Sequence, residues 1–183
     1  MLLGLMGAMP EEMDKIIDAL TDKKVVERGS RLYYRGKLYG QEVVAVFSRW
    51  GKVAAATTAT NLIVEFGVDR IVFTGVAGAI SDDLNIGDVV IAQRLFQHDM
   101  DARPLMRRFE IPLTGKTSYE ISEQNSGLMV EAVHNFLKNN IQLRNFALVQ
   151  HAPTPKLMLG DIASGDLFIS GTEMKKALIR NLP

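Results

Sequence analysis

Apolar runs and helical spacings alternate along the chain, beginning at its N-terminus. Residues 2–8 carry no charge and are largely apolar, which predicts a buried strand. Pro10 suits the first turn of a helix, whose apolar positions recur at helical spacing from Met13 to Leu20. This end of the chain is therefore predicted to be a strand that runs into an amphipathic helix.

The exchange of strand-like and helical segments continues through the sequence. Strands are predicted at residues 24–28, 31–38, 42–48, 70–74, 89–92, 146–149 and 157–163, and helices at 52–66, 127–139 and from 172 onward. Gly36 and Gly40 are expected in turns, and Gly67 at the end of the second helix. Ser170 and Glu173 are spaced as a capping box before the last helix. Alternating strands and helices favour one α/β domain, residues 1–183, around a mixed sheet.

Residues 99–124 depart from this pattern, because they combine prolines, glycine and many polar groups without a clear period. A long loop is predicted here, and loops of this length in compact domains are often functional. Four of its side chains are apolar enough to favour burial against a partner: Leu105, Met106, Phe109 and Ile111. A homodimer is therefore expected.

Composition narrows the class of protein. The apolar share is 47%, the charged share is 23% and the formal net charge is zero, as in ordinary globular proteins. A neutral chain carries no basic footprint for nucleic acid, and no apolar run approaches the roughly 20 residues that span a bilayer. Without cysteine there are no disulfides or thiolate metal sites. Together with an N-terminus that lacks a basic leader, these absences favour a soluble cytoplasmic protein without nucleic-acid or membrane partners.

The first candidate for chemistry is the segment GLMGAMPEE at residues 4–12. Its glycines allow the backbone to turn tightly and to approach a ligand, and ligands of open α/β sheets lie beyond the carboxyl ends of strands. Glu11 and Glu12 stand there, at the start of a helix. The alternative is that both acidic side chains only complement the helix dipole, as acidic residues in first turns commonly do.

The second candidate is the segment FTGVAGA at residues 73–79, again at the end of a strand. Its small residues leave room and exposed amides that would suit a phosphate or the flat face of a base. Neither the Walker pattern nor the dinucleotide fingerprint is present. Close packing between strands is the alternative explanation of these glycines.

The third candidate is SGDLFIS at residues 164–170, between a strand and a helix. Phe168 is suited to stacking on an aromatic base, and Ile169 to offering backbone hydrogen bonds to a base edge. A hydrophobic staple before the last helix is the alternative. His98 and Asp99 lack the ligand spacing of a metal site, so no metal is expected. Trp50 belongs either to the core or to the wall of a pocket.

Taken in order, GLMGAMPEEM, SRWGKVAAA, FTGVAGAI, NIGDVVIAQ, HDMDA and SGDLFISG resemble the motifs of the 5'-methylthioadenosine/S-adenosylhomocysteine nucleosidases, within the purine nucleoside phosphorylase superfamily. The resemblance spans residues 2 to about 181. It implies a three-layer α/β/α sandwich with a mixed, partly barrel-like sheet. It also implies hydrolysis of the N-glycosidic bond of an adenine nucleoside, by a homodimer that needs no cofactor.

The resemblance also implies roles for individual residues. Glu12 matches the glutamate that acts as general base on the attacking water. Seven further positions match substrate-binding positions: Met9 against the ribose, Trp50 in the pocket for the 5'-substituent, Val76, Ala77 and Gly78 beside purine and ribose, Phe168 stacked on adenine, and Ile169 at the adenine edge. Trp50 replaces a smaller aliphatic residue, and Val76 a serine. The segment after His98 resembles one that covers the partner's site.

Beyond Pro183 the family continues into a strand, with a Met-Glu pair that holds the ribose, and then into a Ser-Asp that protonates the leaving purine. Neither is present in this sequence, which therefore resembles a C-terminally truncated member lacking the final strand and helix. The chain alone is expected to have little activity. A nucleoside phosphorylase of the same fold and a non-catalytic nucleoside-binding fragment are the alternative functions, and the preferred 5'-substituent is left open.

Overall fold

The computed structural model describes residues 1–139 and 154–182, and the strand predicted at 146–149 lies outside these ranges. The chain forms two compact units, Met1–Ala77 and Gly78–Pro183. Both combine strands with helices, so the predicted α/β class is confirmed. The strands belong to two hydrogen-bonded sheets, one of five strands and one of three.

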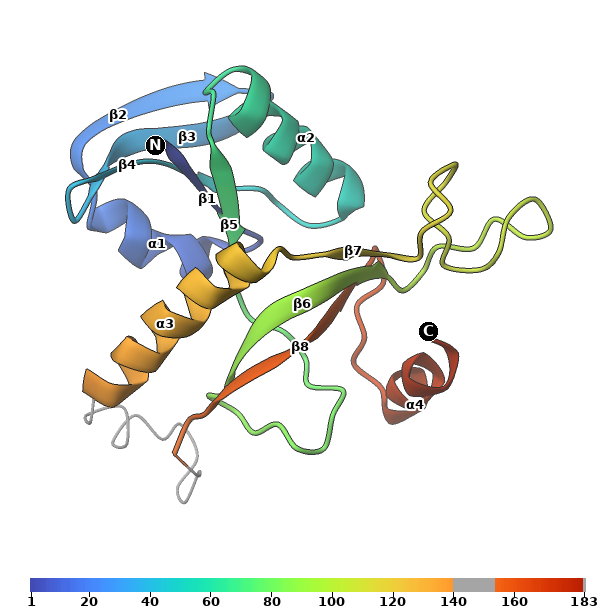
Figure 1. The fold of residues 1–183 in the computed structure, drawn as a ribbon. Helices are drawn as coiled ribbons and strands as arrows, with labels where there is room; N and C mark the ends of the chain where they lie inside the picture. Colours follow the sequence, from blue (N-terminus) through green and yellow to red (C-terminus); the bar gives the residue numbers. More distant parts are fainter. Residues whose placement is uncertain (140–153, 183) are drawn as a thin grey trace. The chain divides into compact units, whose positions relative to one another are not determined.

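The first unit contains a five-stranded mixed sheet with two helices (Figure 1). Its elements are β1 (Leu3–Gly7), α1 (Pro10–Asp18), β2 (Thr21–Arg28), β3 (Arg31–Leu38), β4 (Gln41–Phe47), α2 (Lys52–Val64) and β5 (Arg70–Phe73). The strand order is β2-β3-β4-β1-β5. Strand β1 runs parallel to β4 and β5, whereas β2, β3 and β4 pair antiparallel. The carboxyl ends of β1, β4 and β5 therefore meet at one edge of the sheet.

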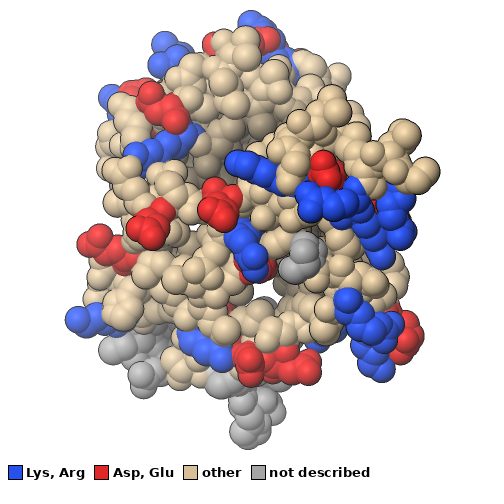
Figure 2. Space-filling model, turned by 45° about the vertical axis from the view of Figure 1, so that its right-hand side comes forward, with Lys and Arg blue, Asp and Glu red and all other residues tan. Residues whose placement is uncertain are grey.

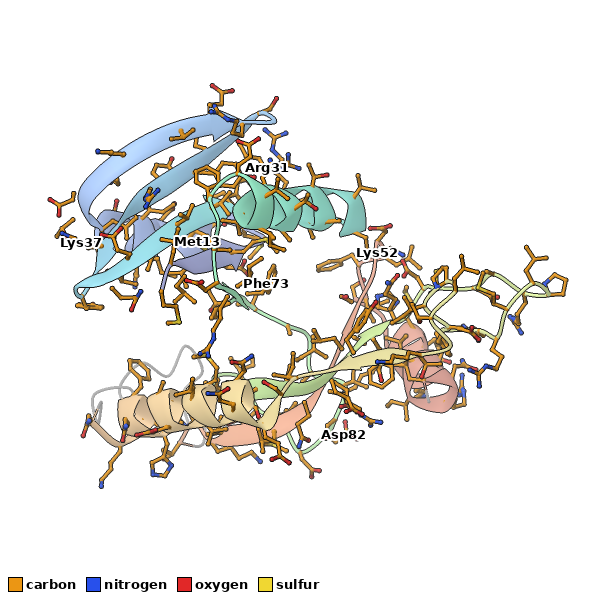
Figure 3. All side chains as sticks on the ribbon, turned by 45° about the horizontal axis from the view of Figure 1, so that its top comes forward. Met13, Arg31, Lys37, Lys52, Phe73 and Asp82 are labelled. Carbon is orange, nitrogen blue, oxygen red and sulfur yellow. The ribbon has the colours of Figure 1, made fainter. Side chains whose placement is uncertain are left out.

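Alternating side chains of β1 and β4 divide the core of this unit into two layers. Leu5 of β1 packs with Met13 of α1 on one face of the sheet, where Figure 3 labels Met13. Met6, the next residue of β1, packs with Leu62 of α2 on the other face. Because successive strand residues point to opposite faces, α1 and α2 cover opposite sides, as Figure 1 shows. The result is the α/β/α layering expected from the sequence.

The second unit is built on a three-stranded sheet in the order β7-β6-β8. Its elements are β6 (Val89–Gln97), β7 (Ser118–Glu120), α3 (Glu123–Asn139), β8 (Leu157–Ser164) and α4 (Thr172–Asn181). Strand β6 is parallel to β8, and the pairing continues to Gln97 opposite Ser164. Helix α3 packs against β6 and β8. None of the helices in the described ranges is long and apolar enough to cross a membrane.

Three local predictions were wrong. Gly36 lies inside β3 rather than in a turn, and a Cβ there would stand 2.6 Å from the carbonyl oxygen of Thr21. The close approach of the backbone of β2, not a turn, therefore requires glycine at this position. Helix α4 has Gly171 as its N-cap, with no side-chain cap, so the predicted capping box does not form. Helix α3 begins at Glu123, inside the segment predicted as loop.

Residues 99–124 are also more ordered than a plain loop, since they contain β7 and the start of α3. Phe109 and Ile111 are only 5% and 8% exposed, so they are already buried within the chain. Leu105 and Leu113 are 86% and 93% exposed. Fewer apolar side chains of this segment are therefore exposed to a partner than the sequence indicated.

Candidate functional site

Glu12 stands in the first turn of α1, where its carboxylate accepts three backbone hydrogen bonds. Its Oε2 accepts the N–H groups of Ala8 and Met9 at 2.8 and 2.9 Å. Its Oε1 accepts the N–H of Val76 at 2.8 Å, across 64 residues of sequence. The first two bonds satisfy amides at the start of a helix, which otherwise lack partners. The third ties this helix to the segment after β5.

Complementing the helix dipole therefore explains part of the role of Glu11 and Glu12, but not all of it. Glu11 and Glu12 both lie in the first turn of α1, and Glu12 binds the amide of the N-cap residue, Met9. A role confined to the helix end would not require the third donor, which comes from the segment after β5. Glu11 is exposed to solvent, whereas Glu12 is partly buried. Glu12 is therefore the member of the pair that the fold holds in place.

Two glycines provide the space that the Glu12 carboxylate occupies. A Cβ on Gly75 would lie 2.5 Å from Oε1 and 2.8 Å from Oε2 of Glu12. A Cβ on Gly7 would lie 2.8 Å from the sulfur of Met13 and 3.3 Å from Oε2 of Glu12. Any side chain at Gly75 would have to displace the carboxylate. The sequence singled out both glycines, but the residue they accommodate is apparent only from the fold.

The hydrogen-bond geometry leaves Glu12 one acceptor direction. An ionised carboxylate has about four acceptor positions, two on each oxygen. Two donors reach Oε2 and one reaches Oε1 among the described residues. A water molecule at the remaining position on Oε1 would be held by a fixed oxygen, which is what a general base acting on water requires.

The segment after β5 uses its backbone more than its side chains. The Val76 amide binds Glu12, while the Val76 side chain is 80% exposed. Ala77 is exposed, and a Cβ on Gly78 would meet nothing within 4 Å. Close strand packing therefore does not explain these small residues. Phe73, labelled in Figure 3, is 55% exposed at the end of β5, and the sequence placed it in the candidate segment 73–79 without a role for its side chain.

Trp50 lies in a sharp connection between β4 and α2. Its side chain is 76% exposed and belongs to neither hydrophobic cluster, so it is not a core residue. Arg31, labelled in Figure 3, donates from Nε to the carbonyl oxygen of Ser48 at 3.1 Å. Arg49 and Gly51 flank Trp50 with φ angles of 70° and 90°. Both values are left-handed, so the connection presents Trp50 on a tightly turned backbone.

In the second unit, Phe168 and Ile169 follow the carboxyl end of β8. Phe168 is 89% exposed and Ile169 is partly buried. Phe168 lies three residues before the N-cap, Gly171, and a staple would require a packed residue directly before it. The staple explanation therefore does not fit Phe168. A large aromatic face open to solvent is available for a flat ligand.

His98 and Asp99 contact the turn that precedes Phe168. His98 is only 6% exposed, and its backbone N–H donates to the carbonyl oxygen of Ser164 at 3.0 Å. Asp99 accepts the N–H of Asp166 on Oδ2 at 2.8 Å. Across residues 1–139 and 154–182, no three His, Asp or Glu side chains gather as a metal site. Both residues therefore belong to the framework of this turn.

Charged side chains of both signs occur on the surface, and several of them form ion pairs. On the face in Figure 2, acidic and basic side chains are interspersed among uncharged ones. Asp101 hydrogen-bonds the guanidinium of Arg103, which lowers the pKa of Asp101 to about 2. Arg94 and Asp161 form a two-point ion pair at 2.6 and 3.0 Å, which raises the pKa of Arg94. Asp161 thus has a structural partner on the neighbouring strand.

The sequence and the fold are similar to those of a known class of proteins. The chain belongs to the phosphorylase superfamily, whose sequence model matches residues 2–183. It is 36% identical over its whole length to an aminodeoxyfutalosine nucleosidase of Campylobacter jejuni, of which it covers 72%. It is 32% identical to a 5'-methylthioadenosine/S-adenosylhomocysteine nucleosidase of Staphylococcus haemolyticus, again along its whole length and over 72% of that protein.

Solved structures agree with this family membership. The chain matches a 5'-methylthioadenosine/S-adenosylhomocysteine nucleosidase of Colwellia psychrerythraea in complex with adenine at a TM-score of 0.81 and 29% identity, over 100% of this chain and 69% of that one. It matches a mutant Helicobacter pylori nucleosidase with 5'-methylthioadenosine in the active site at 0.79 and 29%, over 98% and 71%. These relatives are nucleosidases, and the nucleoside phosphorylase-like fold expected from the sequence is confirmed.

Proposed function

We propose that this chain carries the water-activating and base-binding parts of a nucleosidase that hydrolyses the N-glycosidic bond of 5'-substituted adenine nucleosides. The observation that carries the proposal is the Glu12 carboxylate, which is held by three amides with one acceptor position left for water. Membership of the superfamily and the names of the nucleosidase relatives support it.

In this reaction the bond between C1' of the ribose and the base nitrogen breaks, and a bond from C1' to the water oxygen forms. Glycosidic cleavage passes through an oxocarbenium-like transition state, so the water must be oriented and must lose a proton as it attacks. Glu12 accepts that proton. General-base assistance of this kind typically contributes about 10²–10⁴-fold in rate. We assign protonation of the leaving base to no residue among the 183.

For substrate binding we propose the residues that the family motifs indicate. Phe168 stacks on adenine, and the backbone of Ile169 binds the adenine edge. The segment from Val76 to Gly78 and the side chain of Met9 contact the ribose and purine, and Trp50 borders the 5'-substituent. The high exposure of the Phe168 and Trp50 side chains supports these assignments, because both aromatic surfaces are available to a ligand.

For the substrate itself we propose 5'-methylthioadenosine and S-adenosylhomocysteine, as in the Staphylococcus haemolyticus relative. Aminodeoxyfutalosine is the second candidate, because the Campylobacter jejuni relative named for it shares 36% identity with this chain. Release of the free base from each of the three nucleosides, compared as kcat/KM, distinguishes them. A phosphorylase of the same fold would instead show release that depends on added phosphate.

We further propose that the protein acts as a cytoplasmic homodimer without a cofactor, in which residues 99–124 approach the partner's site. The exposed Leu105 and Leu113 of this segment support a partner surface. Each is a large apolar side chain left in water by the chain alone, which is unfavourable without a contact.

The test of the proposed function is Glu12→Gln in the full-length protein. Glutamine keeps the shape of the side chain but removes the base, so kcat should fall by about 10²-fold or more while KM changes little. Glu11→Gln is the matched control, because it removes the same charge from an exposed neighbour in the same helical turn. Full activity of the Glu12→Gln protein, with the control also active, would refute the role of Glu12.

A further inference from the structure

The turn that carries Phe168 is fastened to the end of the neighbouring strand by its backbone. Strands β6 and β8 pair in parallel until Gln97 meets Ser164. Immediately beyond, the His98 N–H donates to the Ser164 carbonyl oxygen at 3.0 Å. Asp99 then accepts the N–H of Asp166 on its Oδ2 at 2.8 Å. The Asp99 side chain thus adds one further hydrogen bond between the two segments beyond the end of the paired strands.

Gly165 allows this contact to be as close as it is. A Cβ on Gly165 would stand 2.6 Å from Cε1 and Nε2 of the His98 ring and 2.8 Å from Cγ of Asp99. The His98 residue is only 6% exposed, so its ring has little freedom to withdraw. The two side chains and the turn are therefore fitted against each other, and the position of one fixes that of the other.

The position of Phe168 has few other constraints. Phe168 is 89% exposed, and Leu167 before it is 59% exposed, so packing of these side chains does not hold the turn. Helix α4 does not begin until Thr172, and its N-cap, Gly171, has no side-chain cap. The bond from Asp166 to Asp99 lies two residues before Phe168. It is the described contact best placed to orient the aromatic ring.

We infer that Asp99 is a positioning residue for base recognition, acting through the Asp166 amide to place the ring of Phe168 against adenine. This inference rests on the proposed function, in which Phe168 stacks on the base. A stacked ring must be held parallel to its ligand before binding, because ordering a loose segment on binding reduces affinity. Asp99 supplies that order from the strand end.

The experiment measures the dissociation constant of adenine by titration calorimetry on the full-length protein. Asp99→Ala removes the acceptor of the Asp166 amide, and affinity should fall by about tenfold. Asp99→Asn keeps an oxygen acceptor and should restore most of the affinity. Gly165→Ala keeps the Asp99 side chain but places a Cβ against both His98 and Asp99, which forces them away from the turn, so it should weaken adenine binding as well.

Asp161→Ala is the matched control, since Asp161 lies on β8 outside the proposed site and accepts its hydrogen bonds from Arg94 on β6. Its adenine affinity should stay within about twofold of wild type. A double-mutant cycle with Phe168→Ala distinguishes a positioning role of Asp99 from a merely structural one. If Asp99 acts through the ring, Asp99→Ala should cause little further loss in the Phe168→Ala protein. In turnover, KM should rise more than kcat falls.

Equal adenine affinity of wild-type and Asp99→Ala proteins would overturn the inference and leave the proposed function intact. Additive losses from Asp99→Ala and Phe168→Ala would overturn it too, because the two residues would then act independently. A wild-type protein that does not bind adenine would overturn the base recognition in the proposed function and this inference with it. Loss on Asp99→Ala, rescue by Asp99→Asn and non-additivity with Phe168→Ala together would establish it.

Discussion

Replacing Gly75 by alanine should inactivate the enzyme without unfolding it. The new Cβ would lie 2.5 Å from Oε1 of Glu12, whereas ordinary contact begins near 3.4 Å. The φ of Gly75 is outside the left-handed region, so alanine itself fits the backbone. What must move is the end of a flexible side chain. The carboxylate therefore withdraws by about 0.9 Å, and the hydrogen bond from Val76 is stretched or lost.

The two consequences of that movement differ in size. Losing one hydrogen bond costs about 1 kcal/mol of stability, which lowers the Tm of a chain of this length by roughly 2–4 °C. Misplacing a catalytic group by about 1 Å can cost about 100-fold in rate, equivalent to roughly 2.7 kcal/mol of transition-state stabilisation. Activity should therefore fall far more than stability.

The assay compares kcat and Tm of Gly75→Ala with those of Gly127→Ala, where a Cβ meets nothing within 4 Å. The control should keep wild-type turnover. In a Glu12→Gln background, Gly75→Ala should cost little more, because the displaced group no longer acts as a base. Wild-type turnover by a folded Gly75→Ala protein would refute the claim that the position of the Glu12 carboxylate matters.

Three further predictions concern specificity, assembly and titration. Trp50→Ile should raise kcat/KM for S-adenosylhomocysteine relative to 5'-methylthioadenosine by about tenfold. An unchanged ratio would show that Trp50 does not border the pocket for the 5'-substituent. Light scattering of the full-length protein should give about twice the mass of one subunit, and Leu105→Asp should restore the monomer. A wild-type monomer at micromolar concentration would contradict the dimer. Arg103 lowers the pKa of Asp101 from 3.8 to about 2, so the stabilisation that this pair gives the fold is present above about pH 4 and is lost as the pH falls through 2. Arg103→Gln should therefore raise the midpoint of the Asp101 titration followed by NMR, and a midpoint of 3.8 in the wild-type protein would contradict the pairing.

The sequence predicted best what depends on neighbouring residues. Strand β3 and the start of α1 at Pro10 follow the predicted bounds, because periodicity and proline geometry are local properties. The α/β class followed from the alternation of these elements. The two-sheet arrangement did not follow, since which strands pair is decided by contacts between distant residues.

The candidate site shows the same division. The segment around Glu12 was recognised as a strand end with acidic residues, but its hydrogen bond to the Val76 amide spans 64 residues and has no local signal. Gly165 was recognised as part of a turn, whereas its contact with His98 depends on the register of two parallel strands. Gly36 was placed in a turn, although a neighbouring backbone explains it. In all three cases a glycine or a polar residue is explained by its contact with a residue distant in the sequence.

The amide that binds Oε1 of Glu12 belongs to Val76, shortly after the end of β5, which is an edge strand among the described residues. Among the residues that the structure describes, β1 is the only strand that pairs with β5 in the order β2-β3-β4-β1-β5, so a local opening of β5 costs less free energy than unfolding of the sheet. Such an opening releases Oε1, while the amides of Ala8 and Met9 still hold Oε2. The hydrogen-exchange rate of the Val76 amide therefore measures how often the carboxylate loses its alignment. Activity should fade with fraying of this edge, at a lower temperature than the cooperative melting of the core.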